Sequence, residues 1–170
     1  AGIRSYSLGS YKKTFLKADK FLSNENYDAA LPLFLSIDSV DKDNANVKYK
    51  IGVCYLNSQT EDKSKAIVYL LEASKYVGDG YNKNDIKEKR APKYTYKQLA
   101  RAYHLNYEFD KAISMYLKYK ETLGTGRKIT AEIEEIMHGI EACTNGSDLI
   151  KNSKGVKVAN LGANINSSYS

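Results

Sequence analysis

The sequence predicts an all-α protein made of three helical hairpins in tandem, followed by a single capping helix. The main observation is a spacing that recurs three times along the chain. In each copy a small residue stands three positions before an aromatic one, and later a second small residue stands four positions before a bulky one. Small residues let two helices approach closely while large ones fill the neighbouring hole, so this spacing is typical of stacked helix pairs. The small–aromatic pairs are Ala18–Phe21, Gly52–Tyr55 and Ala100–Tyr103, and the small–bulky pairs are Ala30–Phe34, Ala66–Leu70 and Ala112–Tyr116.

The first hairpin is predicted to follow a loose lead-in. Phe15 and Ala18 fall on one face of its first helix, as helical periodicity requires. Pro32 lies deep in its second helix, which predicts a distorted or late first turn there. The predicted ranges are 1–9 for the lead-in, 10–23 and about 27–39 for the helices, and about 11–44 for the repeat.

The second hairpin is followed by an insertion. Its helices are predicted at 45–57 and 63–77, in a repeat over about 45–80 that Gly78-Asp79-Gly80 ends. The polar and basic stretch from Tyr81 to Ala91 then lengthens the interval to the next repeat. Insertions of this kind map to one face of an array, so this stretch is a candidate contact loop.

The third hairpin and a cap helix complete the predicted domain, residues 10–151. Pro92 suits the start of a helix, and Gly124-Thr125-Gly126 breaks the last hairpin. The cap helix has one apolar face for the last hairpin and a charged face (Glu132, Glu134, Glu135, Glu141) for water. The predicted ranges are 93–106 and 109–122 for the helices, about 93–124 for the repeat, 130–151 for the cap with a break near Asn145-Gly146, and 152–170 for an extended linker or the start of a missing β-domain.

These offsets resemble the tetratricopeptide repeat over about residues 11–124. The resemblance implies a superhelix whose concave side is lined by the first helix of each hairpin and binds proteins. The sequence departs from the family pattern at Thr14 and Lys48, where the family has an aromatic residue, and in lacking the usual proline at each repeat end. The matching residues are Ala18, Phe21, Tyr27, Ala30, Phe34, Ile51, Gly52, Tyr55, Ala66, Leu70, Leu99, Ala100, Tyr103, Phe109, Ala112 and Tyr116.

A narrower resemblance lies in the carboxy-terminal part. The stretches 142–146 and 156–169 are similar to the junction in Bacteroidetes envelope proteins where tetratricopeptide repeats precede a WD-like β-propeller and an OmpA-like peptidoglycan-binding domain. Some of those proteins are associated with type IX secretion and gliding motility. The resemblance implies a periplasmic, outer-membrane-associated scaffold, with peptidoglycan contacted only through the missing domain. Two isolated cysteines do not indicate a compartment, so the residues themselves do not exclude a cytoplasmic location.

The family's groove-facing offsets define a candidate concave protein-binding surface. Tyr and Arg dominate interface energetics, and Lys97 and Arg101 stand one helical turn apart. We therefore expect these two to grip an acidic side chain or terminal carboxylate of an extended peptide, with a solvated basic face as the alternative. The candidate surface comprises Lys12, Phe15, Asp19, Asn46, Tyr49, Val53, Tyr94, Lys97, Arg101 and His104.

Nucleic-acid binding is the alternative function. The net charge is +6, and basic residues over 81–101 are interleaved with Tyr81, Tyr94 and Tyr96, as base-stacking platforms would be. The mixed charge of the remaining sequence and the periplasmic setting argue against it.

Catalysis and cofactor binding are not predicted. No nucleophile–base pair or metal-ligand spacing is present, and His104 and His138 stand far apart in the pattern. Cys54 and Cys143 are isolated, so each is expected to be a small buried hydrophobe that does not pair with the other. No apolar run approaches the roughly 20 residues of a membrane-spanning helix.

Overall fold

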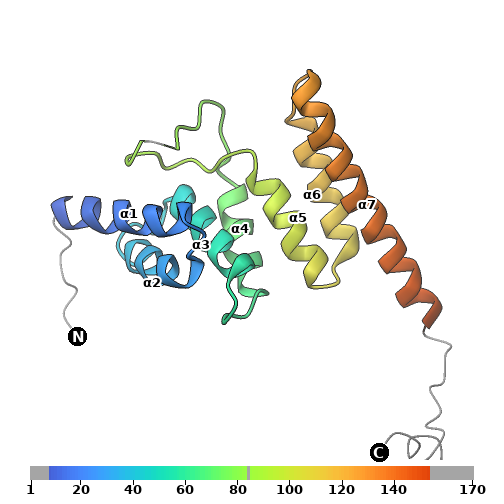
Figure 1. Ribbon diagram of the computed structural model, residues 1–170, viewed down its shortest axis with the longest axis horizontal. Coiled ribbons are helices and arrows are strands. Elements are labelled where there is room, and N and C mark those ends of the chain that lie inside the picture. Colours follow the sequence, from blue (N-terminus) through green and yellow to red (C-terminus); the bar gives the residue numbers. More distant parts are fainter. Residues whose placement is uncertain (1–7, 84, 154–170) are drawn as a thin grey trace, which may run out of the picture.

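The computed structural model describes residues 8–83 and 85–153, and this part of the chain is all-helical, as the sequence predicts. Each helix packs against the next one along the chain, and α3 also contacts α5. Figure 1 shows α1 and α7 at opposite ends of the resulting array. The helices are α1 (Leu8–Ser23), α2 (Tyr27–Asp38), α3 (Ala45–Asn57), α4 (Lys65–Ser74), α5 (Thr95–Leu105), α6 (Phe109–Glu121) and α7 (Arg127–Ser153).

The boundaries of the first hairpin follow from local chemistry. Glu25 takes a left-handed conformation (φ 57°) in the turn after α1. The Asn26 side chain then accepts a hydrogen bond from the Ala29 backbone N–H at 3.2 Å and caps α2. Because this cap fixes the start of α2 at Tyr27, the late start expected from Pro32 does not occur, and the helix continues past Pro32.

The small residues of the repeated spacing lie in the core. Ala18, Ala30, Ala66, Ala100 and Ala112 are each 0% exposed. Gly52 packs so tightly on Leu70 that a Cβ atom at this position would collide with that side chain. The predicted close approach of paired helices is therefore confirmed at these positions.

The cap helix α7 is a continuous helix of 27 residues, so the break predicted near Asn145-Gly146 is wrong. A Cβ atom on Gly139 would lie 2.8 Å from Cζ of Tyr116, and one on Gly146 would lie 2.6 Å from Cζ of Phe109. Both glycines thus face aromatic side chains of α6, and a Cβ atom at either position would force the facing ring to move. The packing against α6 outweighs the low helix propensity of glycine, which is roughly 1 kcal/mol relative to alanine.

The two predicted terminal segments fall mostly outside the described residues. Of the lead-in predicted at 1–9, the structure describes only Leu8 and Gly9, which already belong to α1. Of the linker predicted at 152–170, it describes only Asn152 and Ser153, which still belong to α7.

Candidate protein-binding surface

The candidate surface is contributed by the odd-numbered helices, but it is more buried than an open groove would be. Phe15, Asn46 and Lys97 are at most 3% exposed, whereas Lys12 is exposed. The remaining six residues are half-buried: Asp19, Tyr49, Val53, Tyr94, Arg101 and His104.

A buried lysine that sequence reasoning missed joins α1 to α3. Lys50 is 5% exposed, and its ammonium group forms an ion pair and hydrogen bond with the carboxylate of Asp19. The same Nζ lies 5.5 Å from the ring centre of Phe15 and 5.9 Å from that of Phe34. An aromatic face and a carboxylate together stabilise an ammonium group that burial would otherwise disfavour. Asp19 is therefore committed to an internal contact.

A second buried lysine joins α5 to α7. The Nζ of Lys97 donates to Oε1 of Glu132 at 2.8 Å and to Oε2 of Glu135 at 2.7 Å. Burial lowers the pKa of Lys97, but the two carboxylate hydrogen bonds more than offset this, so the net pKa is raised. The sequence predicted that Glu132 and Glu135 face water, whereas in the structure both bind Lys97. They occupy the position in which we expected the carboxylate of a ligand.

Arg101 has no carboxylate partner of this kind among the described residues. Its Nη1 donates to Oε1 of Gln98 at 2.8 Å, which is a neutral acceptor. One turn further along α5, the ring of His104 stacks edge-to-face on Phe109 with a centroid separation of 5.8 Å. The two members of the predicted pair therefore differ in their surroundings. The charge of Lys97 is neutralised by carboxylates of the protein itself, whereas that of Arg101 is not.

Tyrosines fill the space beside Lys97. Tyr94 and Tyr119 meet edge-to-face at 5.7 Å, and the Lys97 ammonium lies 5.2 Å from the ring centre of Tyr94. Burial is the main cause that raises the pKa of Tyr49, with electrostatic contributions from Tyr81, Tyr94 and Tyr119. The Tyr94–Tyr119 pair thus brings aromatic surface from the start of α5 and from α6 together.

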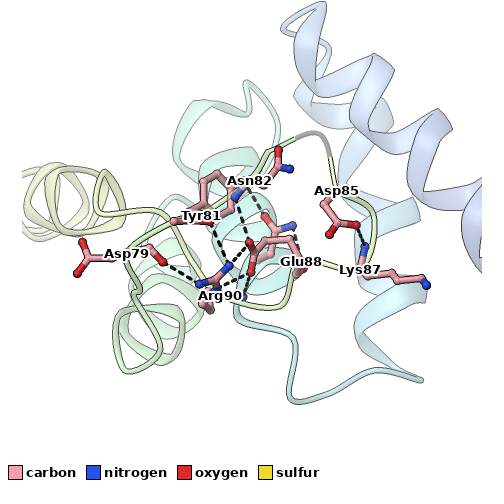
Figure 2. A network of polar contacts seen from close by, with 9 residues as sticks. Asp79, Tyr81, Asn82, Asp85, Lys87, Glu88 and Arg90 are labelled. Atoms are coloured by element: carbon pink, nitrogen blue, oxygen red, sulfur yellow. Dashed lines mark hydrogen bonds and ion pairs between the residues drawn. The ribbon is translucent and has the colours of Figure 1, made fainter.

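The insertion after α4 is folded around one carboxylate. We call residues 78–83 and 85–92 the strap. The side chain of Glu88 is 5% exposed and accepts hydrogen bonds from the backbone N–H groups of Asn82 (3.0 Å) and Arg90 (2.9 Å). The Arg90 guanidinium donates from Nε to Oε1 and from Nη2 to Oε2 of Glu88, each at 2.8 Å. It also donates to the backbone carbonyls of Asp79 and Gly80. These hydrogen bonds, led by that of the Arg90 side chain, lower the pKa of Glu88 to about 2. Figure 2 shows this network.

The strap packs back onto α3, and the contact role that the sequence predicts for this insertion stays a prediction. The backbone N–H of Asn46 donates to the carbonyl of Lys89 at 3.1 Å, and its side-chain amide donates to the carbonyl of Glu88 at 3.3 Å. The hydroxyl of Tyr81 donates to the Asn46 side chain at 3.0 Å. Asn46 is therefore fully engaged by the strap. A 34-residue repeat period carries no information about which face an insertion covers, so this contact could not be predicted.

The basic segment proposed for nucleic acid is largely neutralised. Lys89 pairs with Asp41, Arg90 with Glu88, and Lys93 with Asp79. Lys97 is buried between two carboxylates, and the ring of Tyr96 is only 9% exposed. Binding of single-stranded nucleic acid needs unpaired cations to contact the phosphates and accessible aromatic rings to stack on the bases. Lys83 and Lys87 are exposed, but this geometry disfavours the alternative function.

Other classes of site find little support in the part of the chain that the structure describes. Cys54 and Cys143 are both free and buried, as predicted, and burial raises the pKa of the Cys54 thiol to about 12. No group of three or more His, Cys, Asp or Glu residues among residues 8–83 and 85–153 is arranged to hold a metal ion. None of the described helices has the length and apolarity needed to cross a bilayer.

In comparisons with known proteins, no protein-family model matches this sequence, and no curated protein is significantly similar to it. The residues and geometry of the chain itself are therefore the basis for its functional assignment.

Proposed function

We propose that this protein is a non-catalytic scaffold that binds another polypeptide along its odd-numbered helices, in the manner of a tetratricopeptide-repeat superhelix. The observation that supports this most directly is that Tyr49, Tyr94, Arg101 and His104 are all half-buried, so each keeps exposed surface for a partner. Tyrosine and arginine are enriched at the energetic centres of protein interfaces. Stacked hairpins can extend such a lining along several helices.

We expected Lys97 and Arg101 to bind a carboxylate of the ligand together, and we now propose that Arg101 binds it alone. Lys97 already binds Glu132 and Glu135, so a ligand would have to displace α7 to reach it. Arg101 donates to a neutral amide oxygen and keeps further N–H groups for a bidentate contact. An acidic side chain or terminal carboxylate of an extended peptide is therefore the expected partner group.

Site-specific photo-crosslinking in cells tests this proposal. A photo-reactive phenylalanine replaces Tyr94 in one variant and Tyr76 in the control, because Tyr76 is 66% exposed and lies after α4, outside the odd-numbered helices. We expect a discrete protein adduct from position 94 only. Arg101→Glu should abolish that adduct, whereas Lys63→Glu, at an exposed site on another surface, should preserve it. Equal adducts from both positions, or an adduct that survives Arg101→Glu with helicity intact, would contradict the proposal.

We further propose a setting in the bacterial envelope, in a type IX secretion-associated assembly at the periplasmic side of the outer membrane. This part is supported by the resemblance of the stretches 142–146 and 156–169 to envelope proteins of that kind. Fractionation of the source bacterium with an antibody against the chain tests it. Recovery with outer-membrane and periplasmic markers is expected, and recovery with cytoplasmic markers only would exclude it.

A further inference from the structure

The outer faces of the first and last helices carry opposite charge. On α1, Lys13, Lys17 and Lys20 follow the spacing of one helical face, and all three are exposed. This face lies opposite the buried Phe15 and Ala18. Among the residues that the structure describes, none of the three lysines has an ion-pair partner, and the first acidic residue of the sequence is Asp19. We call these three lysines the basic row.

On α7, Glu134, Glu141 and Asp148 stand seven residues apart and are all exposed. They lie opposite the side of α7 that packs on α6, where Ile136 and Cys143 are buried. The described part of the chain offers Glu141 only a distant contact with His138 at 3.8 Å. We call these three carboxylates the acidic row.

The two rows match in spacing as well as in charge. Lys13 and Lys20 are seven residues apart, as are Glu134 and Glu141, which corresponds to about 10 Å along each helix axis at 1.5 Å per residue. An exposed apolar side chain follows the first charge by three positions in each row. This residue is Leu16 on α1, which is 53% exposed, and Met137 on α7, which is 46% exposed. One parallel register therefore places Lys13 level with Glu134 and Lys20 level with Glu141, while Lys17 stands level with His138 and Asp148 adds negative charge beyond the last pair.

From this complementarity we propose that copies of the chain associate head to tail, with the basic row of α1 in one copy against the acidic row of α7 in the next. The rows lie at opposite ends of the array (Figure 1), so a contact of this kind leaves one row of each sign unused. Such a heterologous contact propagates into an open chain and does not close as a dimer. It uses neither Arg101 nor Tyr94, so it is independent of the proposed ligand-binding face.

The contact is small and mainly electrostatic. One helix face per copy falls in the class of weak interfaces, below about 1,200 Å² of total buried area. Raising the salt from about 0.01 M to about 1 M shortens the screening length from about 30 Å to about 3 Å, which should dissolve the assembly. We therefore expect reversible association at high protein concentration and low salt.

Charge reversal in analytical ultracentrifugation tests this inference on the whole chain. The basic-row variant is Lys13→Glu/Lys17→Glu/Lys20→Glu, and the acidic-row variant is Glu134→Lys/Glu141→Lys/Asp148→Lys. Each should lower the association constant by about tenfold or more, since two exposed pairs of about 0.2 to 1 kcal/mol are lost and replaced by repulsion. Mixing the two variants should restore association, and so should the sixfold exchange within one chain, which keeps the net charge at +6.

Two controls separate this contact from non-specific attraction. The basic-row variant has a net charge of zero, because +6 minus 6 is 0, so non-specific association would increase in it. Lys42→Glu/Lys63→Glu/Lys87→Glu has the same net charge with both rows intact and should associate at least as strongly as the wild type.

Three outcomes would overturn the inference. A wild-type chain that stays monomeric at low salt excludes the contact. A mass that stops at two copies indicates a closed dimer. Binding of the monomer to phosphatidylglycerol vesicles, lost in the basic-row variant alone, would make α1 a lipid-binding helix.

Discussion

The α1–α3 and α5–α7 junctions use the same chemical device with different redundancy. In each junction, an almost fully buried lysine lies beside an aromatic ring and forms an ion pair with the neighbouring odd-numbered helix. Lys50 of α3 reaches α1, and Lys97 of α5 reaches α7. Among the described residues, Lys50 has one carboxylate partner, Asp19. Lys97 has two, Glu132 and Glu135.

This difference should determine how each junction responds to damage. A buried ammonium group without a counter-ion is strongly destabilising, whereas one that keeps a second carboxylate remains neutralised. The α1–α3 junction therefore depends on one side chain. The α5–α7 junction can lose either carboxylate and still hold the cap helix.

The largest single-residue effect is expected for Asp19→Ala. The substitution leaves the Lys50 ammonium buried with only the rings of Phe15 and Phe34 around it. The free energy of unfolding should fall by about 2 to 3 kcal/mol, measured by urea denaturation. Asp148→Ala, at an exposed site on α7, is the control and should change it by less than about 0.5 kcal/mol.

The double variant Asp19→Leu/Lys50→Met gives an internal check on that explanation. Replacing both members of a buried pair by apolar residues is often neutral or stabilising, so stability should return. A loss of under about 1 kcal/mol in Asp19→Ala would mean that Lys50 escapes to water and that the junction does not depend on this pair.

A smaller effect is expected for Glu132→Ala, because Glu135 remains 2.7 Å from the Lys97 ammonium. We expect a loss of about 1 kcal/mol for this single variant, and a clearly larger loss than the sum of the singles for Glu132→Ala/Glu135→Ala. Additive losses would show that the two carboxylates do not substitute for each other and would remove the contrast with Asp19.

The two cysteines report the junctions separately. Cys54 lies one turn after Lys50 in α3, and Cys143 lies on the face of α7 that packs on α6; both are 0% exposed. Thiol labelling under native conditions therefore requires local opening. Asp19→Ala should accelerate the labelling of Cys54 more than that of Cys143, and the Glu132/Glu135 double variant should do the reverse.

The sequence was sufficient to place the helices and their small-residue contacts. Periodicity reports which face of a helix is apolar, and Ala30, Ala66 and Ala112 lie in the core as that pattern indicates. It was also sufficient to nominate residues of the odd-numbered helices as one candidate surface. The nature of that surface as a ligand site remains a prediction.

The junctions themselves could not be predicted, because their partners are distant in the sequence. Lys50 stands 31 residues from Asp19, and Lys97 stands 35 and 38 residues from Glu132 and Glu135. Charged residues at such separations follow no local spacing rule, so the sequence predicted a ligand contact for Lys97 and a water-facing side for the glutamates, and it made no prediction for Lys50. The helix break predicted at Gly146 is wrong for a related reason. The contact of Gly146 with Phe109 forms only when α6 and α7 pack together, so the sequence gives no sign of it.

Alkaline pH should sharpen the comparison through Tyr11, which ties α1 to the turn before α3. Burial and the hydrogen bond from its hydroxyl to Asp41 at 3.0 Å raise the pKa of Tyr11 from 10.0 to about 12. A raised pKa in the folded state gives stability that is present below pH 10 and is lost between about pH 10 and pH 12. At pH 11 the Tyr11 contribution to this loss should be at most about 1 kcal/mol, because the side chain is only partly buried.

Tyr11→Phe should therefore lose less stability than the wild type between pH 10 and pH 11, even if it is less stable at neutral pH. Urea denaturation at each pH measures this, and tyrosinate absorbance shows whether ionisation accompanies unfolding. If the free energy of unfolding falls equally with pH in the two proteins, ionisation of Tyr11 does not contribute to the loss of stability.

The smallest effect is expected at Thr95, which opens α5 two residues before Lys97. Its side chain is 0% exposed, and its hydroxyl oxygen has no hydrogen-bond partner among the described residues. Thr95→Val keeps the shape and removes the unsatisfied hydroxyl, so the free energy of unfolding should stay the same or rise by up to about 1 kcal/mol. If the α5–α7 junction depends only on the Lys97 carboxylates, Cys143 labelling should not change. A loss of more than about 1 kcal/mol, together with faster Cys143 labelling, would identify the Thr95 hydroxyl as a further support of that junction.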